Sequence, residues 1–198
     1  MLPSDEELAL RLKTGDKEAF RIIFDRYGNR ILTYICRFLG DYHKAEDVTM
    51  LAFDKALKSI RDYVETGHFS SWLYRIAVNC AKRELENRAR RKEVYIESHM
   101  NIAAHDGGKA VDFNEVLTDE KNRPDRNAEE NELREIIQEA LLKLDSKYRD
   151  ALLLCDVEGL TYNEAARISN VTRFNIAIRV LRARRMLGDM LKKFRDEL

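Results

Sequence analysis

The sequence predicts an all-α protein made of two small helical domains that are joined by a long, flexible acidic linker. Only 8 of the 198 residues are glycine and only 2 are proline, which is too few for the many tight turns of a β-sandwich or barrel. Apolar residues recur with helical spacing in both halves of the chain. Residues 93–127 lose this spacing, and so long a loop argues for two domains. We therefore expect domains at residues 1–92 and 128–198.

The first two helices are predicted from the residues that begin and end them. Ser4 and Glu7 form a capping-box pattern, which opens a short helix that runs to about Lys13. Gly15-Asp16 ends this helix and begins a second one, in which aromatic and aliphatic residues recur at helical spacing. Gly40 is expected to end the second helix.

The third and fourth helices flank a predicted loop. The third helix directs its apolar residues inward, Leu57 among them. Residues 61–68 break the helical spacing and are expected to form the loop. Ser70 or Ser71 can cap the fourth helix, which ends in a basic cluster. Trp72 shares the face of the apolar residues of this helix, so we expect it in the core rather than on a stacking surface.

The C-terminal domain is predicted to begin near Ala128 with two helices, which end at a turn at residues 158–160. Thr161 and Glu164 then repeat the capping-box pattern ahead of a short helix. We expect another turn at Ser169-Asn170, because asparagine tolerates the left-handed backbone conformation that a tight turn needs.

The last predicted helix is basic, and Thr172 can cap it. A capped short helix, a tight turn and a basic helix are typical of a helix-turn-helix, although an ordinary helical hairpin has the same outline. In a helix-turn-helix the second helix enters the major groove of DNA, and its first residues meet the base edges. Here these are Arg173, Phe174, Asn175, Ala177 and Ile178, and the following arginines, Arg179, Arg182, Arg184 and Arg185, can reach phosphates.

Charge is distributed unevenly along the chain. Lys and Arg number 35, as do Asp and Glu, so the formal net charge is zero. Residues 71–95 nevertheless carry a net charge of +4, residues 97–140 carry −7 and residues 171–195 carry +7. Two basic segments around an acidic one indicate two contacts with a polyanion, the alternative being that all three are solvated surfaces.

Residues 75, 79, 82, 83 and 86 lie roughly along one face of the fourth predicted helix. This face offers several cations and the amide of Asn79. Such a surface suits contacts with a nucleic-acid backbone and an occasional base.

The residue pattern argues against catalysis, a bound metal and a membrane span. The three cysteines and four histidines lack ligand spacing, so we expect no disulfide framework, no zinc site and a reducing cytoplasm. The acidic N-terminus does not resemble a signal peptide, and no apolar run is long enough to cross a membrane. Neither a glycine-rich phosphate loop nor a nucleophile–base set is recognisable, so we expect no enzyme activity and no cofactor.

Several motifs resemble those of the extracytoplasmic-function (ECF) sigma factors of bacterial RNA polymerase, which belong to the sigma-70 family. In the N-terminal half they are Ala-Glu-Asp-Val at 45–48 with Phe53, and Phe-x-x-Trp-Leu-x-Arg-Ile-Ala-x-Asn at 69–79. In the C-terminal half they are Glu-Gly-Leu-Thr-Tyr-x-Glu-Ala-Ala at 158–166 and Leu-Arg-Ala-Arg at 181–184. The resemblance covers nearly the whole chain in the right order.

The resemblance implies a protein that binds core RNA polymerase and opens promoter DNA. The N-terminal domain would dock on the clamp helices of the largest subunit through Asp47, Met50, Leu51 and Asp54, and the second domain would lie near the flap. The loop before the Phe-x-x-Trp motif would capture a flipped base of the minus-ten element, which costs a few kcal/mol of unstacking. The residues implied are Arg61, Tyr63, Val64, Glu65, Thr66, His68, Ser71, Arg75, Asn79, Lys82 and Arg83. The acidic linker would follow the path of nascent RNA or serve only as a solvated tether.

Two departures from the family pattern bear on partners. Met50-Leu51 stands where Gln-Glu is usual, which indicates either an altered interface or core packing. Ala177 and Ile178 replace hydrogen-bonding residues of the recognition helix, and bulky Phe174 stands at its entrance. Each lost polar contact removes roughly 1–3 kcal/mol of base discrimination. The minus-thirty-five residues implied are Thr161, Thr172, Arg173, Phe174, Asn175, Ala177, Ile178, Arg179 and Arg182.

We therefore predict a sigma factor with unusual minus-thirty-five recognition. In one alternative, the apolar residues of the recognition helix face a protein partner: an anti-sigma factor, an activator or a DNA-targeting protein that recruits the polymerase. In the other, they read a different DNA sequence through thymine methyl groups. A stand-alone helix-turn-helix regulator is the alternative function, but it leaves the motif at 69–79 unexplained.

Overall fold

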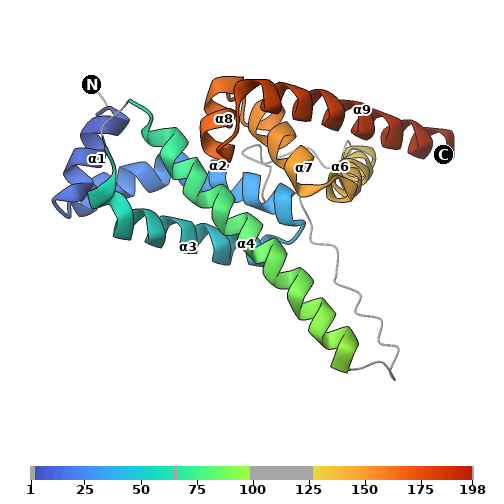
Figure 1. Ribbon diagram of the computed structural model, residues 1–198, viewed down its shortest axis with the longest axis horizontal. Coiled ribbons are helices and arrows are strands. Elements are labelled where there is room, and N and C mark those ends of the chain that lie inside the picture. The colour runs from blue at the N-terminus through green and yellow to red at the C-terminus, as the bar shows by residue number, and fades with distance from the viewer. Residues whose placement is uncertain (1–2, 65–66, 99–126, 198) are drawn as a thin grey trace.

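The computed structural model describes residues 3–64, 67–98 and 127–197, and every regular element within these ranges is a helix (Figure 1). The all-α prediction is therefore confirmed. The greater part of the predicted linker, residues 99–126, lies outside the described residues. The elements are α1 (Asp5–Lys13), α2 (Lys17–Leu39), α3 (Tyr42–Ser59), the 3-10 turn η1 (Ile60–Asp62), α4 (Phe69–Ser98), α6 (Asn127–Lys143), α7 (Ser146–Leu152), the π-helical turn η2 (Leu153–Val157), α8 (Tyr162–Ser169) and α9 (Arg173–Glu197).

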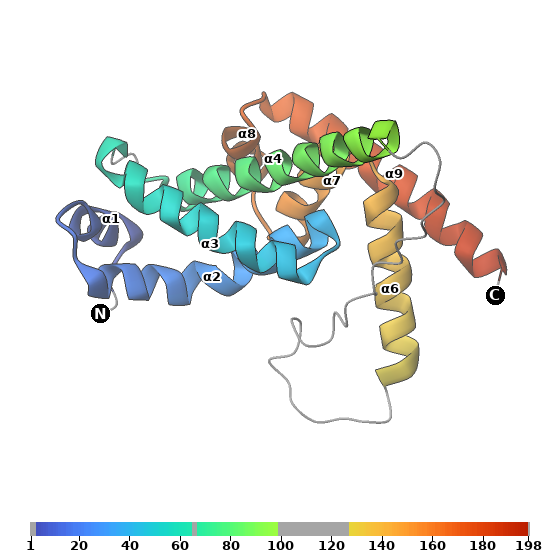
Figure 2. The same cartoon turned by 90° about the horizontal axis from the view of Figure 1, so that it is seen from below.

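The N-terminal half is a bundle in which α2 packs on α3, and α3 packs on α4 (Figures 1 and 2). The predicted capping box is present, because the Ser4 hydroxyl accepts from the Glu7 backbone N–H and the Glu7 carboxylate accepts from the Ser4 N–H. Gly40 ends α2 as predicted, with a positive φ of 69°. Helix α4 continues to Ser98, beyond the predicted end of the domain.

Three details of α3 and α4 differ from the predictions. Leu57 is 40% exposed rather than buried, although it borders a small apolar pocket together with residues of α1, α2 and α4. Helix α4 begins at Phe69, so neither serine caps it, and Ser71 is buried inside its first turn. Trp72 packs against the core but is only half-buried, since one side of its ring borders a cavity.

The C-terminal half ends in the predicted helix-turn-helix, formed by α8 and α9. Thr161 and Glu164 make the expected capping box, and Asn170 ends α8 in the left-handed conformation with a φ of 53°. The Thr172 hydroxyl accepts a hydrogen bond of 3.2 Å from the N–H of Asn175, which confirms its capping role. Leu181 is 70% exposed, because Val180 and Ala183 fill the buried face of α9 instead.

The two halves pack against each other, with α4 lying between α3 and α8 (Figures 1 and 2). Asp150 of α7 is fully buried between them. Its carboxylate accepts hydrogen bonds from Tyr34 Oη at 2.7 Å and from Ser169 Oγ at 3.1 Å, and it forms a 2.5 Å ion pair with Lys82 Nζ. Burial, with the nearby Asp150 carboxylate, raises the pKa of Tyr34 well above its ordinary value, so this hydroxyl remains a donor.

A second cation, which is buried, reinforces this contact. The Arg149 guanidinium donates to the carbonyl oxygens of Leu141, Leu142 and Leu144 in its own half, and to that of Phe38 in α2 at 2.5 Å. It therefore satisfies the last carbonyls of α6 and one near the end of α2 at once. Each of the three guanidinium nitrogens therefore donates at least one hydrogen bond, which offsets the cost of burying this charge.

The π-helical turn directs a third polar contact toward the N-terminal half. It is followed by Glu158, whose carboxylate accepts from Tyr74 Oη at 2.5 Å and forms an ion pair with Arg30 at 3.4 Å. This contact explains why Tyr74 is buried although it lies outside the apolar face predicted for α4.

Candidate nucleic-acid interface

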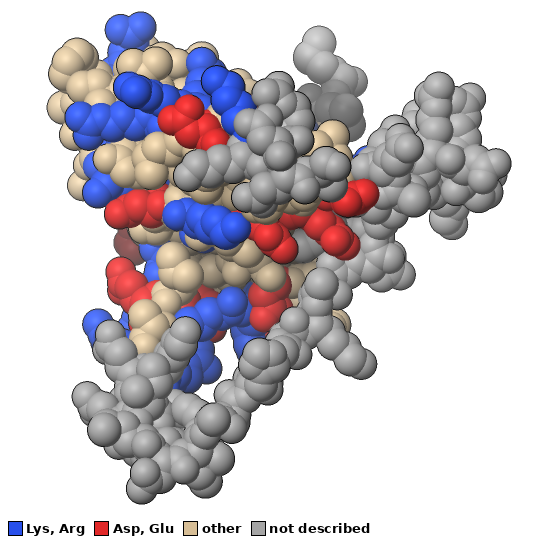
Figure 3. All heavy atoms as spheres, turned by 90° about the vertical axis from the view of Figure 1, so that its right-hand side faces the viewer, with Lys and Arg blue, Asp and Glu red and all other residues tan. Residues whose placement is uncertain are grey.

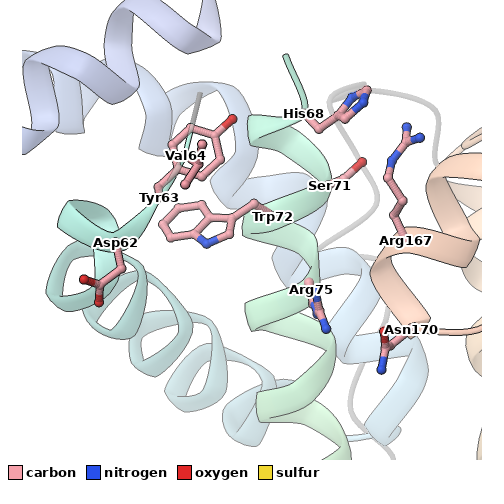
Figure 4. Close-up of a pocket in the computed structure, with 9 residues that line it drawn as sticks. All are labelled: Asp62, Tyr63, Val64, His68, Ser71, Trp72, Arg75, Arg167 and Asn170. Carbon is pink, nitrogen blue, oxygen red and sulfur yellow. The ribbon is translucent and has the colours of Figure 1, made fainter. Parts of the chain in front are cut away.

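A cavity of about 370 Å³ lies between the loop that follows η1, the start of α4, and α8 (Figure 4). Residues from both halves of the chain form its walls. Those from the N-terminal half are Asp62, Tyr63, Val64, His68, Ser71, Trp72 and Arg75, and those from the C-terminal half are Arg167 and Asn170.

Aromatic rings form one wall of the cavity and cations stand at its other side. The Trp72 ring lies 5.0 Å from that of Tyr63 and 5.5 Å from that of Phe69, measured between ring centroids. Arg75 of α4 and Arg167 of α8 approach from the side opposite Tyr63 (Figure 4). This combination is typical of proteins that bind single-stranded nucleic acids, in which bases stack on aromatic rings and phosphates meet arginine.

The cavity gathers several of the predicted minus-ten residues. Tyr63, Val64, His68, Ser71 and Arg75 all line it, whereas the predicted Glu65 and Thr66 lie outside the described residues.

The other predicted minus-ten residues do not line the cavity. Arg61, Asn79 and Arg83 are exposed beside it, on η1 and α4. Lys82 is held by the carboxylate of Asp150, so in this arrangement it is not a free phosphate contact.

Sequence reasoning missed four residues of the cavity, one of which, Asp62, lies within the predicted loop but was not among the candidate residues. Trp72 was expected to be in the core, but it also faces the cavity. Arg167 and Asn170 were not singled out, because they reach the cavity only through the packing of α8 against α4. No pattern within the sequence signals that packing.

Helix α9 presents a surface that is both basic and apolar. Arg173 and Asn175 are exposed, and Phe174 is 75% exposed. Ala177, Ile178 and Arg179 are partly exposed one turn further on. Seen from the right-hand side of Figure 1, Lys and Arg gather in the upper part of the molecule and again toward the bottom, with Asp and Glu between them (Figure 3).

The arginines of α9 are not equivalent. Arg184 makes two hydrogen bonds, of 2.8 and 2.6 Å, to the carboxylate of Asp156 in η2. These bonds raise the pKa of Arg184 above its ordinary value and hold the side chain against its own half. Arg182 lies 3.4 Å from the Tyr148 hydroxyl. For Arg179 and Arg185 no carboxylate within ion-pair distance is found among the described residues.

Helix α3 exposes the residues that depart from the family pattern. Met50 is 59% exposed and Leu51 is 45% exposed, so the core-packing explanation for this pair is wrong. Asp47 and Asp54 on the same helix pair with Lys44 and Lys58, at 3.3 and 2.6 Å respectively. The face therefore combines exposed apolar side chains with surface ion pairs.

Within the described residues, no group of three or more His, Cys, Asp or Glu is placed to hold a metal ion. Burial raises the pKa of the Cys36 thiol to about 11, which keeps it protonated and unreactive at neutral pH. No described helix is both long and apolar enough to cross a membrane.

A cavity with an aromatic wall and arginines, together with a helix-turn-helix whose second helix is basic, is typical of a DNA-binding transcription factor. Residues 23–91, which cover most of α2–α4, match Sigma-70 region 2, and residues 134–187 match Sigma-70 region 4. Over 95% of its length the chain is 31% identical to the RNA polymerase sigma-H factor of Pseudomonas aeruginosa, of which it covers 94%. The chain belongs to the ECF sigma factors, and it is not an enzyme but a transcription initiation factor.

Other relatives agree with this family. The chain is 30% identical to the ECF RNA polymerase sigma-E factor of Haemophilus influenzae, over 96% of both chains. The fold is similar to that of CnrH in its complex with the cytosolic domain of CnrY, with a TM-score of 0.67, 22% identity and coverage of 96% of this chain and 99% of the other. It is also similar to that of the sigma factor RpoE of Bartonella quintana in its complex with the anti-sigma factor NepR, with a TM-score of 0.61, 18% identity and coverage of 87% and 96%.

Proposed function

We propose that this sigma factor captures one unpaired base of the promoter in the cavity beside Trp72, while α3 docks on the polymerase. The observation that carries the proposal is the convergence of Tyr63, Trp72 and Arg75 on a single cavity. Its size, its aromatic wall and its arginines fit a flipped nucleotide, whose unstacking costs a few kcal/mol that pocket contacts offset. The rest of the DNA strand would then contact Asn79 and Arg83 on the exposed side of α4, and Arg61 on η1.

We also infer that the two halves separate before promoter binding. Arg167 and Asn170 of α8 form part of the cavity wall, so α8 limits the space that a DNA strand can enter. The Asp150 carboxylate also holds Lys82, which we assign to the DNA backbone. In this proposal residues 1–92 and 128–198 act as two domains, and the segment between them lets them reach two promoter elements.

The exposed face of α3 is proposed as the contact with the polymerase clamp. Met50 and Leu51 supply apolar area, and Asp47 and Asp54 supply charge at its edge. Apolar side chains at the centre of a protein interface contribute more free energy of binding than surface ion pairs do. A Met50→Ala and Leu51→Ala double substitution should therefore weaken binding to core polymerase about tenfold or more.

The recognition helix supports two proposals about the minus-thirty-five element. Phe174, Ile178 and Leu181 follow a spacing of four and three residues along one face of α9, and two of them are strongly exposed. This stripe either contacts a protein that helps to place the polymerase or lies against thymine methyl groups. The arginines at 173, 179 and 185 serve phosphate contacts in both cases.

We further propose that a protein partner controls this sigma factor in the bacterial cytoplasm, where RNA polymerase works. The support is a likeness of fold: RpoE of Bartonella quintana was solved in complex with the anti-sigma factor NepR. We expect this partner to bind the exposed apolar residues of α9 and of α3.

Transcription with purified core polymerase tests the function. The full-length protein is mixed with core enzyme and a library of promoter fragments with random minus-ten and minus-thirty-five segments, and the transcripts are sequenced. We expect initiation at a shared minus-ten sequence, and an Arg75→Ala chain should lose most of it. Initiation by the Arg75→Ala chain at the wild-type level would contradict the proposed role of the cavity, and the family matches do not favour the alternative of a stand-alone regulator.

The same library separates the two proposals for α9. A sharp minus-thirty-five consensus that disappears with Phe174→Ala supports direct reading of DNA. Transcription without such a consensus supports dependence on a partner. Leu10→Ala, an exposed apolar change on α1, away from both α3 and α9, is the matched control for loss of apolar surface.

A further inference from the structure

A single carboxylate of α1 holds both ends of the loop that borders the cavity. Glu6 Oε1 accepts a hydrogen bond of 2.7 Å from Tyr63 Oη and one of 3.2 Å from the backbone N–H of Phe69. Tyr63 begins the loop, and Phe69 is the first residue of α4. One oxygen atom therefore fixes the point where the chain enters the loop and the point where it leaves.

The contact is well suited to hold the loop. Tyr63 and Phe69 are both buried, and a hydrogen bond to a charged acceptor contributes more than one between neutral groups. The carboxylate also stands at the N-terminus of α4, where the helix dipole favours a negative charge.

Helix α1 is itself fixed to the rest of the bundle. The Asp5 carboxylate pairs with Arg26 and accepts a hydrogen bond from Tyr27, both on α2. Glu7 is used by the capping box. Glu6 is thus the acidic residue of this turn that reaches the loop, and α1 gives it a rigid base.

The same contact extends to the wall of the cavity. Tyr63 packs its ring against Phe69 at 5.6 Å and against Trp72 at 5.0 Å, in nearly perpendicular and tilted arrangements. Tyr63 and Trp72 both line the cavity (Figure 4). Fixing the Tyr63 hydroxyl therefore fixes the stacking surface that an inserted base would meet.

The second oxygen of Glu6 shows that this placement has a cost. Glu6 Oε2 is buried and has no hydrogen-bond partner among the described residues. An unpaired buried oxygen lowers stability, so a residue that served only to fold α1 onto the bundle would be better replaced by a neutral one. Buried polar groups without a partner are rare in folded proteins, so this one calls for an explanation.

We propose that Glu6 is a positioning residue for the base-capturing loop, acting through Tyr63 and the first turn of α4. This inference rests on the proposed function of the cavity. Helix α1 lies outside the segments that match Sigma-70 region 2 and region 4, so those matches assign it no part in DNA capture.

The test uses holoenzyme assembled from core polymerase and full-length chains. A pool of single-stranded DNA with a random central segment is selected on the wild-type holoenzyme, and the selected strand becomes the probe. Its dissociation constant is measured for Glu6→Ala, Glu6→Gln, Tyr63→Phe and the Glu6→Ala/Tyr63→Phe double variant. Glu7→Ala, a neighbouring exposed carboxylate that does not contact the loop, is the matched control. The affinity of each chain for core polymerase is measured in parallel.

We expect Glu6→Ala to weaken strand binding about tenfold, because hydrogen bonds to a charged acceptor are removed. Glu6→Gln keeps an acceptor oxygen and should lose less than about threefold. Tyr63→Phe keeps the aromatic ring but removes the hydroxyl that Glu6 holds. Because the two changes remove the same contact, the double variant should bind the strand no more weakly than Glu6→Ala alone. Core-polymerase affinity should stay at the wild-type value in every chain.

Three results would overturn the proposal: equal strand binding by the wild-type and Glu6→Ala chains, an equal loss for Glu7→Ala, or a parallel loss of core-polymerase affinity. If Glu6→Ala does not fold, Tyr63→Phe decides, and unchanged strand binding there also overturns the proposal. A wild-type holoenzyme that selects no strand would refute the proposed function of the cavity instead.

Discussion

Removing the carboxylate of Asp150 should open the contact between the two halves of the chain. In Asp150→Ala the buried Tyr34 hydroxyl loses its acceptor, and the Lys82 side chain, 30% exposed, loses its ion pair. An unpaired buried hydroxyl costs about 1–3 kcal/mol, and breaking a buried ion pair costs about 3–5 kcal/mol. Because Lys82 can turn toward water, we expect the lower end of this range, a loss of about 3 kcal/mol of stability.

The single tryptophan of the chain makes this loss measurable. Trp72 borders the cavity that Arg167 and Asn170 of α8 help to enclose, so its fluorescence reports the separation of the halves. In urea titrations of Asp150→Ala, the fluorescence transition should occur at lower urea than the loss of helical circular dichroism.

Asp156→Ala is the control for this experiment. It removes a surface ion pair within the C-terminal half, to an Arg184 side chain that is 56% exposed. Such a pair is worth about 1 kcal/mol or less. Equal shifts for Asp150→Ala and Asp156→Ala would refute the reasoning.

Three further predictions concern stability, and each is checked by thermal or urea unfolding. Gly40→Ala should destabilise the protein by about 1–2 kcal/mol or more, because φ is positive at this position and an added Cβ would lie 2.5 Å from the Leu142 side chain. An unchanged melting temperature would contradict this prediction. Arg149→Met should cost about 2–4 kcal/mol by leaving buried carbonyls unpaired, and a loss below about 1 kcal/mol would count against it. Hydrogen bonds from Thr161 lower the pKa of Glu164 below its ordinary 4.5, so its contribution is complete above pH 4.5 and is lost as the pH falls through the lowered value. Glu164→Gln should therefore flatten the pH dependence of the melting temperature below pH 4.5, and an unaltered profile would show that this carboxylate is not responsible.

Much of the fold could be predicted because the relevant signals are local. The capping boxes at Ser4 and Thr161 and the left-handed positions at Gly40 and Asn170 depend on residues within one turn, and all four are confirmed. The helix-turn-helix was predicted for the same reason, since its helices are adjacent in the sequence.

The packing between the halves could not be predicted, because it depends on polar residues. From the sequence alone, such residues are expected on solvent-exposed faces of helices. Asp150 and Arg149 look like ordinary surface residues of a helix, yet both are buried. Tyr74 and Val78 lie outside the apolar face that the sequence indicates for α4, yet both are buried, and α4 packs against α8 as well as against α2 and α3. The same packing brings Arg167 to the cavity, which is why part of the candidate site was missed.

Lys82, which is proposed to contact the promoter backbone, forms its ion pair with the buried Asp150 of the same chain. If Lys82 contacts a phosphate in the bound state, that phosphate must displace a carboxylate of the same chain. The measured affinity is then the intrinsic affinity reduced by the fraction of molecules whose halves are apart. A partner that binds only the separated form would tighten DNA binding without touching DNA, and one that binds only the packed form would weaken it by the same linkage.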